Sequence, residues 1–189
     1  MKLFLILLLG ISSLLFRGIE GEDIDYNPRL LHKELSKLLS GQEFQIHELV
    51  LPDSIIRNNR VNGKFFTIMC RESEKYWAYV GRVNSCRTGG CSIQMKDEIA
   101  DNYEYFDYFI LFNSQKKVAA VRVYNYEATH GQEITIKSWL NQFIGFDGTK
   151  SLRVGKEIDS ISGATISVDG LVTDIQAKSI FMKSLLSQD

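Results

Sequence analysis

The sequence contains little proline and carries almost no net charge, and each scarcity excludes a class of protein. Only 2 prolines occur in 189 residues, and 22 basic residues nearly balance 23 acidic ones, which leaves a formal net charge of -1 at pH 7. Disordered chains are typically rich in proline and carry an excess of one charge, whereas nucleic-acid-binding domains carry clustered positive charge. We therefore expect a folded protein that binds no nucleic acid and has no polybasic patch for a membrane surface.

Long hydrophobic runs are also scarce, and the longest lies near the N-terminus. Residues 3–16 are apolar apart from Gly10, Ser12 and Ser13. This run is too short for a membrane span, which needs about 20 apolar residues, and it is typical of a secretory signal. We predict a signal peptide over residues 1–21, with an uncleaved anchor as the alternative. The protein is then exported to the periplasm or another extracytoplasmic compartment.

Histidine and cysteine are also scarce in the sequence, with 3 of each. The 3 histidines are scattered without ligand spacing to a cysteine pair, which argues against zinc. An oxidising compartment favours one disulfide, and Cys70, Cys86 and Cys91 allow three pairings. We favour Cys86–Cys91 as a structural staple, because Gly89 and Gly90 let the short loop fold back; a redox-active pair is the alternative. Cys70, at the end of an apolar run, is expected to be a buried thiol.

The rest of the chain is long enough for one domain with a sizeable core. Periodic apolar patterns predict helices over residues 28–39, 134–143 and 167–186. Apolar and alternating runs predict strands over residues 44–51, 64–70, 76–85, 105–112 and 117–126. Because strands and helices do not alternate regularly, we predict an α+β fold, a single compact domain with a central antiparallel sheet flanked by helices.

One short stretch, residues 159–165, is chemically the most informative. Gly163 and Ala164 have little or no side chain, so a phosphate group and an enzyme's active site can reach the hydroxyl of Thr165. Ser162 adds a hydroxyl donor for phosphate oxygens. The pattern therefore predicts that the hydroxyl of Thr165 is open to a phosphate group and to an enzyme. The alternative is a turn rich in small residues that only starts a helix.

The helix predicted directly downstream supports the first interpretation. Its apolar residues recur at three- and four-residue spacing, and Ser167 is predicted to be its N-cap. A phosphate on Thr165 would then lie at the N-terminus of the helix. Free N–H groups and the positive end of the helix dipole would face it there.

The sequence Asp159-Ser160-Ile161-Ser162-Gly163-Ala164-Thr165, of the form D-x-x-S-G-A-T, resembles the flavinylation site of the FMN-binding domain family. This family includes the flavinylated subunits of sodium-pumping NADH:quinone reductase and of Rnf-type complexes. The resemblance implies FMN joined through a phosphoester to Thr165, with Asp159, Ser162, Gly163 and Ala164 as neighbouring cofactor-binding residues. It also implies maturation outside the cytoplasm by a magnesium-dependent flavin transferase that takes FMN from FAD.

A second segment, Thr129-His130-Gly131, resembles the threonine-proline-glycine turn that the family commonly places against the flavin. Here Ala128 replaces the usual glutamate and His130 replaces the proline. The resemblance implies that all three turn residues help to bind FMN; an exposed turn histidine is the alternative for His130. We expect the likeness to cover residues 76–186. The predicted division is an FMN-binding domain over residues 76–189, with a helix and strands over residues 22–75 packed on the same core.

The resemblance favours an extracytoplasmic electron carrier with covalent FMN. Its expected partners are the flavin transferase, a membrane-side electron donor and a reductase that accepts the electrons. No constellation of acid and base residues in the sequence points to an independent turnover enzyme. Two alternatives stay open, namely a flavin-dependent reductase of a small acceptor and a non-flavin, disulfide-bearing envelope interaction module.

Overall fold

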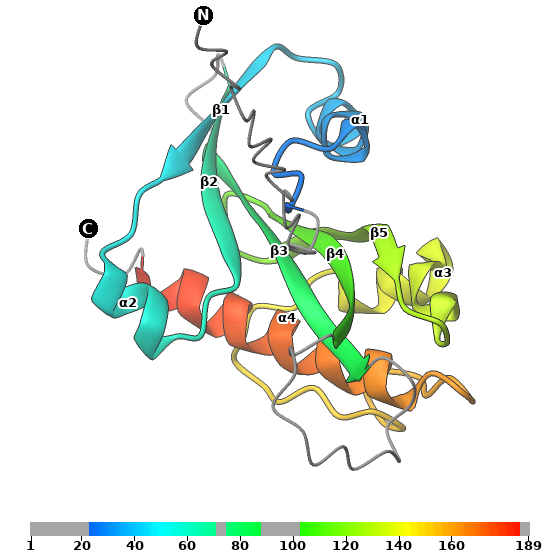
Figure 1. The fold of residues 1–189 in the computed structure, drawn as a ribbon. Coiled ribbons are helices and arrows are strands. Elements are labelled where there is room, and N and C mark those ends of the chain that lie inside the picture. Colours follow the sequence, from blue (N-terminus) through cyan, green and yellow to red (C-terminus); the bar gives the residue numbers. More distant parts are fainter. Residues whose placement is uncertain (1–22, 71–74, 88–102, 186–189) are drawn as a thin grey trace, which may run out of the picture.

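The computed structural model of the chain describes residues 23–70, 75–87 and 103–185. They include one antiparallel sheet of five strands, in which each strand pairs with the next along the chain (Figure 1). The strands are β1 Phe44–Leu49, β2 Gly63–Cys70, β3 Lys75–Arg87, β4 Tyr103–Phe112 and β5 Val118–Glu127. All five predicted strands are confirmed, as is the α+β architecture.

The sheet has two apolar faces because successive side chains of a strand point to opposite sides. One face, with Tyr79 and Tyr108 at its centre, packs against helix α4 (Thr165–Leu185). The other face, which includes Phe109, packs against helix α1 (Arg29–Leu38). Figure 1 shows α4 running along one side of the sheet and α1 on the other. The apolar spacing that predicted both helices therefore marks the sides that they bury.

The predicted helix over residues 134–143 is wrong, because three short elements replace it. They are the 3-10 helix η1 (Gln132–Thr135), the α-helix α3 (Lys137–Leu140) and the 3-10 helix η2 (Asn141–Phe143). Ile136 interrupts them with an extended backbone, at φ -66° and ψ 120°. It ends a run of β-branched residues, which lose side-chain freedom in a helix. A one-turn helix α2 (Asp53–Asn58), which was not predicted, begins directly after Pro52, a position where proline is tolerated.

Two of the predictions for the cysteines and the N-terminus fall outside the described residues. These are the signal peptide at residues 1–21 and the disulfide, since neither Cys91 nor the side chain of Cys86 is described. The expectation of a buried Cys70 is wrong: the residue ends β2 and is half-buried, opposite Phe44 at the end of the β1–β2 pair. No helix in the described part of the chain is long and apolar enough to cross a membrane.

Candidate functional site

Thr165 is exposed at the first residue of α4, where the candidate modification requires it to be. Ala164, directly before it, is buried at 3% exposure and packs into the core beneath the helix. Gly163 has a left-handed backbone with φ 82°, and a Cβ atom there would have no other atom within 4 Å. The open space around Gly163 and the exposed hydroxyl of Thr165 give a second protein access to this point.

No side chain in the described part of the chain caps the N-terminus of α4. The first helical hydrogen bond runs from the N–H of Val168 to the carbonyl of Ala164 at 2.9 Å. Ala164 therefore occupies the N-cap position, and alanine has no oxygen with which to cap the helix. Among the described residues, no acceptor faces the N–H groups of Thr165, Ile166 and Ser167. Three donors are thus left for an anion beside the Thr165 hydroxyl.

The prediction that Ser167 caps the helix is wrong. The helix begins two residues earlier, because the turn that starts it is closed by the backbone at Ala164. Ser167 lies inside the first turn, and its side chain is 2% exposed. Its hydroxyl faces Tyr126 and Ser85, each at 3.0 Å. The residue therefore acts within the core and not as a cap.

The loop before Thr165 is fixed through its backbone. The Asp159 N–H donates to Oε1 of Gln142 at 2.9 Å, and the Asp159 carbonyl accepts from the indole N–H of Trp139 at 2.8 Å. Trp139 is itself buried, in edge-to-face contact with Phe143. The side chains of Asp159 and Ser162 are exposed. The short helical elements between residues 132 and 143 thus place the acceptor loop.

The turn at residues 129–131 lies against the first turn of α4, although residues 132–164 separate the two in sequence. Gly131 has φ 90°, and a Cβ atom on it would be 2.9 Å from Oγ of Ser167 and 2.9 Å from the hydroxyl of Tyr126. Only a glycine fits this approach without displacing those two side chains. The structure therefore brings together the two segments that the sequence marked separately.

The same turn is held at its other two residues. The hydroxyl of Thr129 donates to Oε1 of Glu104 on β4. The carbonyl of His130 accepts from the hydroxyl of Tyr126 at 2.5 Å, while the His130 side chain is exposed. Thr129 is thus held through its side chain and His130 through its backbone, and the imidazole of His130 is exposed.

The sequence analysis did not identify the role of four residues that meet at this site, namely Tyr126, Ser167, Ser85 and Glu104. Tyr126 is the last residue but one of β5, just before the turn, and its ring stacks on Phe106 at 5.7 Å between centroids. Burial raises the pKa of Tyr126 above its usual value, and the hydrogen bond with Ser167 opposes that rise. The partners of these hydroxyls come from strands far apart in sequence, so no local pattern could identify them.

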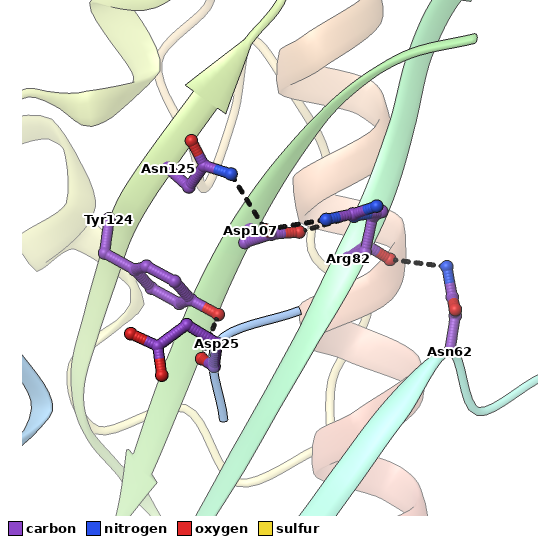
Figure 2. Close-up of polar contacts among 6 residues, drawn as sticks. All are labelled: Asp25, Asn62, Arg82, Asp107, Tyr124 and Asn125. Atoms are coloured by element: carbon purple, nitrogen blue, oxygen red, sulfur yellow. Dashed lines mark hydrogen bonds and ion pairs between the residues drawn. The ribbon is translucent and has the colours of Figure 1, made fainter. Parts of the chain in front are cut away.

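A second polar cluster lies on the opposite face of the sheet. Asp107 is 1% exposed and receives two hydrogen bonds from Arg82, at 2.7 and 3.0 Å, and a third from Asn125 at 3.0 Å (Figure 2). Nearby, the hydroxyl of Tyr124 donates to the carbonyl of Asp25 at 2.7 Å. This cluster joins β3, β4 and β5, and it lies across the sheet from α4.

The described residues fit a phosphate ester at Thr165 and offer no metal centre. Within residues 23–70, 75–87 and 103–185, no three His, Cys, Asp or Glu side chains gather closely enough to bind a metal ion. The candidate acceptor position combines an exposed threonine, three N–H donors that have no acceptor among the described residues, and a glycine with open space around it. These are the features that a phosphate-linked group requires.

Comparison with known families finds a match to part of the chain. Residues 106–177 match the family model for the FMN-binding domain. The match runs from β4 to the middle of α4, so it includes the turn at residues 129–131 and the acceptor loop. It lies inside the span of residues 76–186 over which the likeness was expected. No curated protein and no solved structure matches the chain.

Proposed function

Starting from an FMN-binding domain at residues 106–177, we propose that this protein carries FMN covalently on Thr165 and transfers electrons outside the cytoplasm. A single observation supports attachment at this residue. Thr165 is exposed at the start of a 21-residue helix whose first N–H groups have no acceptor among the described residues. The proposed partners are a flavin transferase, a membrane-side electron donor and a reductase that accepts the electrons.

The attachment step is a phosphoryl transfer to the threonine. Oγ1 of Thr165 attacks the FMN phosphorus of FAD, the bond between the two phosphates of FAD breaks, and AMP leaves. The hydroxyl proton passes to a base of the transferase. Gly163 and Ala164 contribute their small size, which lets the transferase reach the oxygen. The N–H groups of residues 165–167 then stabilise the negative phosphate.

The magnitudes explain why a covalent bond suits such an open site. A helix N-terminus stabilises an anion by about 0.3–1 kcal/mol, and by about 2 kcal/mol in favourable geometry. Nanomolar retention without a bond needs about 12 kcal/mol in total. The exposed start of α4 supplies only a small part of that energy. When bound, FMN supplies the electron-transfer chemistry, and the protein supplies attachment and orientation.

Substitution of the acceptor tests the proposal. The protein would be exported from cells that also produce a flavin transferase, and its intact mass and its colour after acid precipitation would be measured. Wild type should gain the mass of FMN less one water, and T165A should gain nothing. T165S keeps the hydroxyl and should retain FMN, while T173A, at an exposed threonine further along α4, is the matched control. A bare mass for wild type, or FMN retained by T165A, would overturn attachment at this residue.

The electron-transfer role has a separate test. Flavinylated protein, reduced chemically, would be offered a small-molecule acceptor alone and then a partner reductase. A carrier should pass electrons to the reductase without sustained turnover of the small acceptor. Steady-state turnover by the protein alone would favour the flavin-dependent reductase instead.

A further inference from the structure

We propose that Tyr126 and Ser167 are positioning residues for the modification of Thr165. Together with Ser85 and the carbonyl of His130 they form a hydroxyl chain, which holds the turn at residues 129–131 against the first turn of α4. The inference rests on the proposed attachment of FMN, and its test separates the two.

The direction of the hydroxyl chain follows from its last member. A carbonyl oxygen can only accept, so the single proton of Tyr126 points to His130. The Tyr126 oxygen then accepts from Ser167, and the Ser167 oxygen accepts from Ser85. Each hydroxyl donates once, and the chain ends at the backbone of the turn. One arrangement of the protons thus gives each of the three hydroxyls an acceptor for its proton.

The chain acts on the buried side of the same helical turn that presents Thr165. Successive residues of an α-helix are about 100° apart, so residues 165 and 167 point about 200° apart. Accordingly Thr165 is exposed and Ser167 is 2% exposed. Movement of Ser167 away from its partners rotates or shifts this turn, and the acceptor oxygen moves with it.

Tyr126 is well suited to hold the chain in place. Its ring stacks on Phe106, which is fully buried, with 13° between the ring planes. The aromatic stack fixes the ring, and the ring fixes the hydroxyl between Ser167 and the turn. Replacement by phenylalanine keeps the stack and removes only the hydrogen bonds, so Y126F is the most informative variant.

The test measures the rate of FMN incorporation by a purified flavin transferase at saturating FAD, over a range of acceptor concentrations, by intact mass. Y126F and S167A should lower the maximum rate about tenfold, because misplacing a reacting group slows the step itself. Two controls make the same chemical changes elsewhere. Y124F, on β5, removes a tyrosine hydrogen bond to the Asp25 carbonyl on the other face of the sheet. S179A removes a hydroxyl that is buried in α4 and has no partner.

The dependence on acceptor concentration distinguishes positioning from a general loss of stability. A partly unfolded acceptor lowers the concentration of competent protein, so it raises the apparent KM and leaves the maximum rate unchanged. A misplaced hydroxyl lowers the maximum rate of a fully folded acceptor. If S167A does not fold, Y126F decides alone, since its ring packing is retained.

Each outcome bears on a different claim. A lower maximum rate for Y126F and S167A, with normal rates for Y124F and S179A, supports the hydroxyl chain. Equal maximum rates for Y126F and wild type would refute the positioning role while FMN attachment stands. If wild type itself takes up no FMN, the proposed function fails and the positioning role fails with it.

Discussion

Replacing Gly131 with alanine gives the sharpest test of how the turn at residues 129–131 packs on α4. Two effects should add in G131A. The backbone at φ 90° is unfavourable for any residue with a Cβ atom. The new Cβ would also be 2.9 Å from Oγ of Ser167 and 2.9 Å from the hydroxyl of Tyr126. Both oxygens would have to move, and both belong to the hydroxyl chain.

The size of each effect can be estimated separately. A left-handed backbone costs a residue with a side chain about 1–2 kcal/mol. Of the three hydrogen bonds of the chain, the one between Ser167 and Tyr126 can be kept if both hydroxyls move together. The other two, to Ser85 and to the carbonyl of His130, are then weakened or broken, and each is worth about 0.5–1.5 kcal/mol. G131A should therefore lower the free energy of unfolding by about 2–5 kcal/mol.

Gly155 provides the matched control. Its φ is 80°, close to that of Gly131, but a Cβ atom there would have no neighbour within 4 Å. G155A should therefore show the backbone cost alone, about 1–2 kcal/mol. The difference between the variants, about 1–3 kcal/mol, isolates the contact with the hydroxyl chain.

Urea and thermal unfolding, followed by circular dichroism, would measure both variants. In a domain of this size each kcal/mol shifts the melting temperature by about 2–4 °C, so G131A should melt about 2–12 °C below G155A. The reasoning fails if the two variants differ by less than about 0.5 kcal/mol, the usual scale of neutral substitutions. FMN incorporation should also slow in G131A and not in G155A.

Two further predictions concern charged pairs. R82M should lower the free energy of unfolding by about 3–5 kcal/mol, because it leaves the carboxylate of Asp107 buried without its cation; K64M, which breaks an exposed pair, should change it by less than about 1 kcal/mol. The hydrogen bond from Arg153 lowers the pKa of Glu157 from 4.5 to about 2. Any stability from that pair is therefore present above pH 4.5 and is lost as the pH falls towards 2. In R153Q, the pKa of Glu157 measured by NMR titration should rise back towards 4.5. A midpoint for Glu157 that does not change in R153Q would exclude this cause.

The strands and the antiparallel sheet could be predicted because the information is local. Each strand is an apolar or alternating run, and its neighbour in the sheet is the next strand along the chain. The antiparallel pair of β4 and β5, two strands joined by a short connection, and the long α4 also follow from local patterns. The segment at residues 134–143 shows the limit. Its apolar periodicity is genuine, since Trp139 and Phe143 are buried, but an extended Ile136 divides it.

The candidate acceptor loop could be proposed from the sequence, but its immediate surroundings could not. The proposal of Thr165 depends on the small residues beside it and the helix after it. The hydroxyls of Ser85, Ser167 and Tyr126 meet only because β3, β5 and α4 converge. The capping prediction for Ser167 failed for the same reason. A serine near a helix start is a common cap, and only the tertiary contacts show that this one points into the core.

An acceptor for a second enzyme must satisfy two opposing requirements, since it must be exposed and yet have a fixed position. Exposed chain ends and loop tips are usually the least ordered parts of a domain. Here the residues around Thr165 resolve the conflict, because Ala164 is 3%, Ser167 2% and Val168 0% exposed. The buried neighbours fix the backbone on both sides of the one residue that faces outward. Order at the proposed acceptor thus comes from the buried neighbours, while the threonine itself stays exposed to a transferase.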